Sequence, residues 1–197
     1  MKIVFATSNK GKLREAGEIL GPGFELLTPA GLGITEEIPE TGNTLKDNSI
    51  QKADYLYSRT GMNCFADDTG LEVDCLGGAP GVYTARYAGP DCSFDDNMTK
   101  LLREMALKGA DAPRTARFKS VVTLILDGRR YFFEGVMEGR IALAKAGCGG
   151  FGYDPVFISD EYPDRTVAEI SEEAKNAISH RGKALRLMAA FLDETTR

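Results

Sequence analysis

Apolar and polar positions follow two different periods in the first third of the chain. Short apolar runs at residues 2–6 and 24–27 predict two strands, and apolar positions at helical spacing between them predict a helix over residues 11–20. A Gly-Pro-Gly sequence ends that helix, and a loop rich in Gly, Pro and acidic residues leads to a second helix over residues 44–58. This order of elements indicates an α/β protein.

The rest of the pattern predicts long strands. Residues 115–126 and 130–141 form two extended runs joined at Asp127-Gly128, which is a hairpin signal. The shorter predicted elements are strands at residues 62–66 and 156–158 and helices at residues 94–105 and 182–192. Phe94 begins the apolar, core-facing side of the third helix. Because no linker interrupts the chain, we expect residues 1–197 to form a single two-lobed domain around an extended sheet.

Composition narrows the class of protein. With 43% hydrophobic and 27% charged residues the chain is close to globular averages, and no apolar run reaches the roughly 18 residues of a membrane span. The net charge of −5 argues against a protein that tracks a nucleic-acid backbone. The four cysteines show neither zinc-site spacing nor a disulfide framework, so we expect free thiols in a cytoplasmic protein. We expect no membrane partner and no stable nucleic-acid binding.

Two adjacent carboxylates, Asp67 and Asp68, follow an apolar run and precede Thr69 and Gly70. Neighbouring side chains on a strand point to opposite faces, so one aspartate can enter a pocket while the other pins the loop. Hard oxygen ligands of this kind suit Mg²⁺, which takes one or two carboxylates and leaves its other positions to water and phosphates. The same residues are also typical of a turn, and taken alone they leave both interpretations open.

Two further segments could serve a phosphate site. Between the first strand and the first helix, backbone N–H groups, two lysines and two hydroxyls favour an anion such as a triphosphate; the alternative is an N-cap with solvated lysines. A Walker A loop is absent, so a P-loop kinase is not expected. Glu40 ends the acidic loop, and Asn48 and Lys52 share one face of the next helix, either near Asp68 or as ordinary exposed polar residues.

An aromatic, glycine-rich stretch at residues 151–154 suggests a nucleobase site. An aromatic ring beside glycines can stack on a base. Arg181 presents only hydrogen-bond donors, which suit the keto oxygen of a 6-oxo purine better than the amine of adenine. His180 is the single histidine; a structural role for it stays open at this point.

Six motifs occur in order: Thr-x-Asn-x-x-Lys at 7–12, Glu-Thr-Gly at 40–42, Ala-Asp-Asp-Thr-Gly-Leu at 66–71, Gly-Gly-Ala-Pro-Gly-Val-Tyr-Thr-Ala-Arg-Tyr at 77–87, Gly-Gly-Phe-Gly-Tyr-Asp-Pro at 149–155 and Ile-Ser-His-Arg-Gly at 178–182. In this order, over almost its whole length, the sequence resembles the inosine triphosphate pyrophosphatase family, also called Ham1-like or dITP/XTP pyrophosphatases. Cys148 departs from the family pattern, in which threonine is usual.

The resemblance implies a fold and an activity. The fold is α/β, with two lobes around a long twisted mixed β-sheet, flanking helices, the active site in the cleft between the lobes, and a homodimer. The activity is Mg²⁺-dependent hydrolysis of noncanonical purine triphosphates (ITP, dITP and XTP) to the monophosphate and pyrophosphate. This reaction would cleanse the nucleotide pool and prevent incorporation of these nucleotides into DNA and RNA.

The resemblance also assigns roles to residues. Asp68 would be the general base and a Mg²⁺ ligand, Glu40 would help to hold the metal, and Lys52 would be a further catalytic residue. The implied substrate-binding residues are Thr7, Ser8, Asn9, Lys10, Gly11 and Lys12 for the triphosphate, Thr69 and Lys175 for nucleotide or phosphate, and Phe151, Gly152, Tyr153, Asp154, His180 and Arg181 for the base.

Three other functions remain as alternatives. An aspartyl-phosphate phosphatase would need Asp-x-Asp-x-Thr, whereas the two aspartates here are adjacent. A catalytically silent nucleotide-sensing or RNA-binding module does not require the carboxylates, and the negative net charge counts against it. A Maf-like pyrophosphatase, acting on pyrimidine or modified nucleotides, is the more serious alternative, and base preference would discriminate it.

Overall fold

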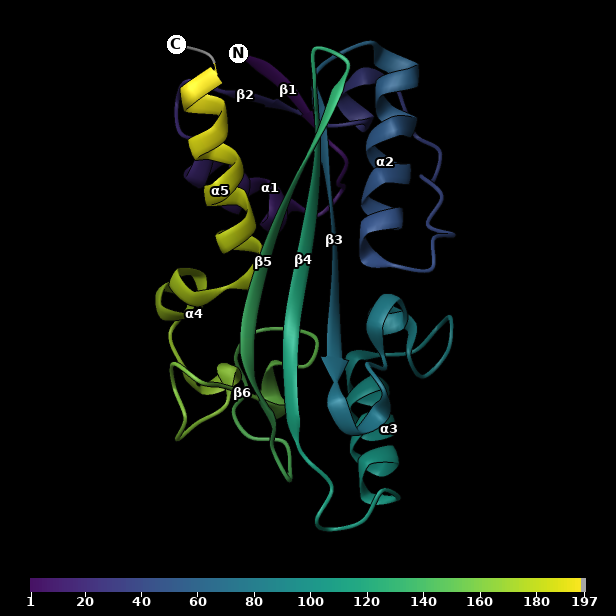
Figure 1. Cartoon of the computed structure of the whole chain (residues 1–197), viewed down its shortest axis with the longest axis vertical. Helices are drawn as coiled ribbons and strands as arrows, with labels where there is room; N and C mark the ends of the chain where they lie inside the picture. The colour runs from purple at the N-terminus through teal and green to yellow at the C-terminus, as the bar shows by residue number, and fades with distance from the viewer. Residues whose placement is uncertain (196–197) are drawn as a thin grey trace. The chain divides into compact units, whose positions relative to one another are not determined.

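A computed structural model describes residues 1–195, which form five α-helices and one six-stranded sheet (Figure 1). The helices are α1 (Lys10–Leu20), α2 (Leu45–Thr60), α3 (Phe94–Ala106), α4 (Glu172–Ile178) and α5 (His180–Thr195). The strands are β1 (Lys2–Phe5), β2 (Glu25–Leu27), β3 (Cys64–Val73), β4 (Thr115–Leu126), β5 (Arg129–Ile141) and β6 (Phe157–Ser159). None of the helices in this described part of the chain is long and apolar enough to cross a membrane.

The sheet is mixed, as the sequence predicts. Its strand order is β2-β1-β3-β4-β5-β6, with β1 parallel to both β2 and β3, and with β5 antiparallel to β6. The two longest strands, β4 and β5, are joined at Asp127 and Gly128, both of which have positive φ. The hairpin predicted from this pair of residues is therefore confirmed.

The chain divides into two compact units. Unit 1 comprises Met1–Asp68, Ser120–Gly135 and the segment from His180 onward, and unit 2 comprises Thr69–Lys119 and Val136–Ser179. Strands β3, β4 and β5 each contribute residues to both units. A single two-lobed domain, with a site between its lobes, stays a prediction.

Unit 1 has helices on both faces of its strands (Figure 1). Side chains alternate along β1, so Ile3 and Phe5 pack in one apolar cluster with α1 and α5, whereas Val4 packs in another with α2. Phe5 stacks on Phe65 of β3, with ring centroids 4.2 Å apart. Both faces of the strands are buried, which explains their nearly continuous apolar sequence.

Local signals explain where the helices of unit 1 begin and end. Asn9 caps α1, because its side chain accepts hydrogen bonds from the N–H groups of Gly11 and Lys12. Thr44 caps α2 in the same way, through the N–H of Asp47. Gly61 ends α2 with a φ of 62°, which is a left-handed conformation that glycine adopts without strain.

The structure departs from the prediction at three places that carry candidate site residues. Strand β3 continues through the two aspartates to Val73, so these residues lie inside a strand and not at its end. Helix α5 begins at His180, two residues before the predicted start, so His180 and Arg181 form its first turn and do not precede it. Helix α4, which carries Lys175, was not predicted, because its seven residues are too few for a clear period.

Unit 2 has its own core, which α3, β6 and parts of β3, β4 and β5 form. Helix α3 begins at a reciprocal capping box that Ser93 and Asp96 form. The prediction that Phe94 faces the core is wrong, because its side chain is 55% exposed and contacts the Phe151 ring, with centroids 6.4 Å apart. Its position in the first turn of the helix, before the buried Met98 and Leu101, explains the difference.

Candidate active site

The two adjacent aspartates of β3 contact helices on opposite faces of the strand. Asp67 is 1% exposed and contacts side chains of α1 and α5. Asp68 is half-buried and contacts side chains of α2. The alternation predicted for neighbouring strand residues is therefore what separates the two carboxylates, and each has a different set of partners.

Asp68 belongs to a cluster with Lys52, Glu40 and Asn48. The Lys52 ammonium donates to Glu40 Oε1 at 2.6 Å and to Asp68 Oδ1 at 3.3 Å, so one cation bridges both carboxylates. Asn48 Nδ2 donates to the other oxygen of Asp68 at 3.1 Å. The structure thus brings together the two predicted metal ligands and Lys52, which the sequence placed in three separate segments.

Burial determines the charge states in this cluster. Burial raises the pKa of the Asp68 carboxyl above its ordinary value, and the nearby Lys52 ammonium and the Asn48 amide only partly offset this. Burial would lower the pKa of Lys52, but Asp68, Asp67 and Glu40 outweigh it, so its pKa is raised and the ammonium keeps its proton.

Asp67 lies in a second, more deeply buried network. The Lys12 ammonium donates to both of its oxygens, at 2.9 and 2.7 Å, and Arg181 Nε donates at 3.2 Å. Arg181 Nη1 also donates to Glu15 Oε2 at 3.0 Å. Burial alone would raise the pKa of Asp67, but the Lys12 and Arg181 cations hold it well below its ordinary value. Asp67 is therefore ionised at neutral pH and pairs with two cations.

At residues 7–12 the structure shows the N-cap of α1, and the anion site stays a prediction. Asn9 is an N-cap, and its own N–H donates to Thr7 Oγ1 at 3.1 Å. The Lys12 ammonium pairs with Asp67, and its side chain is only partly exposed. Ser8, Lys10 and Gly11 are exposed. An anion would therefore meet an exposed helix start whose Gly11 and Lys12 N–H groups are already bonded to Asn9.

The donor set of unit 1 fits a divalent cation together with a polyphosphate. The two networks together contain four carboxylates and three cationic side chains: Glu15, Glu40, Asp67 and Asp68 against Lys12, Lys52 and Arg181. A triphosphate would meet no excess of positive charge there, so its binding calls for an added cation. Asp68 and Glu40 offer two carboxylates, which is the number that Mg²⁺ takes with substrate phosphates. No cluster of three or more His, Cys, Asp or Glu suited to a metal exists within residues 1–195.

Unit 2 holds the predicted aromatic stretch. Phe151 is 56% exposed, and the Lys175 ammonium lies 4.3 Å from the centre of its ring. Asp154 is buried, where it accepts hydrogen bonds from the Phe151 N–H at 2.7 Å and from Lys175. Tyr153 is 3% exposed, and its hydroxyl donates to the carbonyl of Thr84. Tyr153 and Asp154 therefore support the loop from within, and Phe151 is the aromatic ring that it presents.

The predicted residues thus fall into two groups. Unit 1 brings together Asp68, Lys52, Glu40, Lys12 and Arg181, and unit 2 brings together Phe151, Asp154 and Lys175. Thr69 follows Asp68 directly on β3, as the first residue of unit 2. A base pocket that combines Phe151 with His180 and Arg181 stays a prediction. Glu15, which binds Arg181, was not among the predicted site residues. The only hint in the sequence is that this acidic residue lies three positions after Lys12 on α1.

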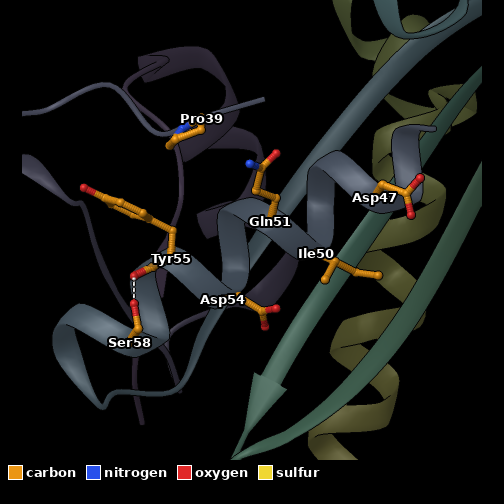
Figure 2. A pocket seen from close by; sticks show the side chains of 7 residues that line it. All are labelled: Pro39, Asp47, Ile50, Gln51, Asp54, Tyr55 and Ser58. Atoms are coloured by element: carbon orange, nitrogen blue, oxygen red, sulfur yellow. Dashed lines mark hydrogen bonds between the residues drawn. The ribbon is translucent and has the colours of Figure 1, made fainter. Parts of the chain in front are cut away.

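A separate pocket of about 590 Å³ lies beside α2 (Figure 2). Its lining residues are Pro39, Asp47, Ile50, Gln51, Asp54, Tyr55 and Ser58. None of the predicted site residues is among them. Gln51 connects this pocket to the loop that carries Glu40, because its Oε1 accepts a hydrogen bond from the Thr41 N–H at 2.9 Å.

The fold is α/β with a mixed sheet, and it carries a carboxylate–ammonium cluster suited to Mg²⁺ and phosphate. These features indicate a phosphate-handling protein, and comparison with known proteins identifies its family. The Ham1 family model matches residues 3–191, so the chain belongs to the Ham1 family. It is 47% identical, over 99% of its own length and 100% of the relative's, to a dITP/XTP pyrophosphatase of Flavobacterium johnsoniae. The corresponding protein of Porphyromonas gingivalis is 48% identical, with 97% of each chain covered. A solved HAM1 protein from Coxiella burnetii superposes with a TM-score of 0.93 at 37% identity, covering 98% of this chain and 99% of that one.

Proposed function

We propose that this protein hydrolyses dITP, XTP and ITP to the nucleoside monophosphate and pyrophosphate, with Mg²⁺, and so removes noncanonical purine nucleotides. The observation that carries the proposal is the Asp68–Lys52–Glu40 cluster, in a chain that matches dITP/XTP pyrophosphatases over nearly its entire length. Hydrolysis of a phosphoanhydride depends mainly on positioning and charge stabilisation, which lysines and carboxylates can supply without a nucleophilic side chain.

Asp68 is the general base in this proposal. Its carboxylate would accept a proton from a water molecule as the water oxygen bonds to the α-phosphorus, and the bond from that phosphorus to the α–β bridging oxygen breaks. Pyrophosphate then leaves in one piece. A pKa raised by burial favours this role, since a base works best when its pKa approaches the working pH.

Lys52, Glu40 and Asp68 would bind the metal ion and the phosphate groups of the substrate. Asp68 and Glu40 would hold Mg²⁺, and the ion would supply positive charge to offset the negative charge of the triphosphate. Lys52, whose ammonium keeps its proton, would orient Asp68 and stabilise charge on the phosphate oxygens. The exposed start of α1, with Lys10, would contact the outer phosphates.

Phe151 would stack on the purine. The Lys175 ammonium lies over the Phe151 ring, and the part of the ring that stays exposed could stack on a base. His180 and Arg181 would contact the 6-oxo edge of the base. Arg181 Nε and Nη1 each already donate to a carboxylate, so only the remaining N–H donors of Arg181 are available for a keto oxygen. A homodimer and a cytoplasmic location belong to the same proposal, and four unpaired cysteines agree with a reducing compartment.

The deciding experiment is product-resolved hydrolysis of ITP, dITP, XTP, GTP, ATP and dTTP by the purified protein, with Mg²⁺ and with chelator. We expect pyrophosphate from ITP, dITP and XTP, little from the others, and none with chelator. Orthophosphate as the product would indicate a phosphatase, and a preference for dTTP would indicate a Maf-like enzyme. Binding without turnover would indicate a sensor, and each of these three results contradicts the proposal.

A further inference from the structure

We propose that Asn48 is a positioning residue that fixes the distance between Glu40 and Asp68. Its Oδ1 accepts a hydrogen bond from the Gly42 N–H at 2.7 Å, and its Nδ2 donates to Asp68 Oδ2 at 3.1 Å. A backbone N–H only donates and a carboxylate only accepts, so the two contacts determine the orientation of the amide. The side chain is 1% exposed, which excludes water as a substitute partner.

One face of α2 holds three consecutive residues of the Glu40 loop, which we define as residues 40–42. Lys52 donates to Glu40, Gln51 accepts from the Thr41 N–H and donates to its hydroxyl, and Asn48 accepts from Gly42. Positions 48, 51 and 52 are neighbours on a helix surface. The loop is therefore attached residue by residue to the helix that also carries Lys52.

The approach of the loop to the helix is close enough to require glycine at position 42. A Cβ atom there would lie 2.6 Å from Asp47 Cβ and 2.9 Å from the backbone nitrogen of Asn48. Neither contact can be relieved by a side-chain rotation. The Gly42–Asn48 hydrogen bond thus forms at one register of the loop on α2.

Asn48 differs from the other two attachments because it also reaches β3 through a neutral, directional group. Gln51 contacts the loop alone and faces the pocket beside α2 (Figure 2). Lys52 contacts both carboxylates, but its ammonium has three rotatable donors and therefore restricts the directions of its hydrogen bonds less than an amide does. Asn48 therefore sets where Glu40 and Asp68 stand relative to one another. Its consequence for Mg²⁺ rests on the proposed function, in which these carboxylates hold the metal.

The test uses variants of Asn48 with a matched control in unit 2. Asn48→Leu removes both contacts, whereas Asn48→Asp keeps an acceptor for Gly42 and loses the donor to Asp68. Asn97 is the control, because it is equally buried and also joins a helix to a loop, accepting from the Ala88 N–H and donating to the Ala85 carbonyl. Asn97→Leu should cost similar stability without touching either carboxylate.

Two readouts are needed: hydrogen exchange of residues 40–42 in the metal-free protein, and the Mg²⁺ concentration for half-maximal hydrolysis of ITP. We expect Asn48→Leu to lose slow exchange in the loop and to require about tenfold more Mg²⁺ or more, the usual effect of losing a partner of a metal ligand. Asn48→Asp should keep slow exchange at Gly42 while its activity falls. Asn97→Leu should change neither readout.

The proposal fails if folded Asn48→Leu keeps wild-type exchange and Mg²⁺ dependence, or if Asn97→Leu raises the Mg²⁺ requirement equally. Should Asn48→Leu not fold, Asn48→Ser, which is too short to span both contacts, gives the same comparison. If the wild-type protein does not hydrolyse ITP, the proposed function fails, and the exchange measurement still decides whether Asn48 holds the loop.

Discussion

Asp67 and Asp68 are adjacent on one strand, yet their carboxyl groups have pKa values displaced in opposite directions. Burial dominates at Asp68 and raises its pKa, whereas the Lys12 and Arg181 cations overcome burial at Asp67 and lower its pKa. Adjacent acids whose environments separate their pKa values commonly have separate roles. Asp68 is suited to take a proton, and Asp67 is suited to hold cations.

These separate roles predict that the same substitution at the two aspartates affects activity in one case and stability in the other. Asp68→Asn should lower kcat by about 10²–10⁴-fold, as expected for loss of a general base, and leave the melting temperature nearly unchanged. Asp67→Asn should destabilise the protein by about 3–5 kcal/mol, because two cations lose their buried partner. Steady-state kinetics and urea unfolding measure both. Full turnover in folded Asp68→Asn would contradict the assignment.

The lowered pKa of Asp67 predicts a loss of stability in acid. The unfolded chain takes up this proton first as the pH falls, since its aspartate has the higher pKa. The stabilisation is complete above roughly pH 4, the ordinary aspartate value, and declines below it toward the lower, folded-state pKa. Urea unfolding of the wild type and Asp67→Asn at pH 7 and pH 3 should show a smaller difference at pH 3. A constant difference would mean that Asp67 titrates alike in both states.

Two glycines of the aromatic loop form a matched pair. Gly150 and Gly152 both have positive φ, 73° and 65°, so alanine at either costs backbone strain of about 1–2 kcal/mol. At Gly150 a Cβ would also lie 2.1 Å from Asp154 Oδ2, whereas at Gly152 nothing lies within 4 Å. Thermal unfolding should therefore show Gly150→Ala to be clearly less stable than Gly152→Ala. Equal melting temperatures would mean that Asp154 does not hold this loop.

The cysteines should differ in reactivity. Burial, and then the nearby Asp54 carboxylate, raises the pKa of the Cys64 thiol to about 12, so almost none of it is thiolate at neutral pH. Cys148 is exposed in the glycine-rich loop. Mass spectrometry after brief iodoacetamide treatment should find Cys148 modified and Cys64 unmodified. Labelling of Cys64 in the native protein would indicate that its surroundings open to solvent.

The sequence predicted the elements well where periodicity was strong, as in the long hairpin strands and in α1 and α2. The pair Asp67-Asp68 was predicted at a strand end because the apolar run at residues 62–66 stops just before it. The strand continues because Lys12, Arg181, Lys52 and Asn48 satisfy both carboxylates from opposite faces. These pairings join residues from 16 to 114 positions apart, and no local pattern reveals them.

The candidate site was predictable as a set of residues but not as a set of contacts. Motif order selected Glu40 and Asp68, and helical spacing from Asn48 added Lys52. The structure added that the Lys52 ammonium bridges the two acids. Tyr153 was predicted to contact a base because aromatic residues beside glycines often do so. Tyr153 is buried, and its hydroxyl donates a hydrogen bond to the Thr84 carbonyl. Only the folded chain shows that partner.

The division of the chain also constrains how the protein is made. The apolar cluster that contains Ile3 and Phe5 is completed by Leu185, Met188 and Leu192 of α5. Unit 1 therefore remains without part of its core until residues near 192 have left the ribosome, and it exposes apolar surface until then. Neither unit is a continuous stretch of sequence, so no single cut yields one of them intact. A nascent chain that stalls before α5 is accordingly a substrate for chaperones and proteases, whatever the state of unit 2.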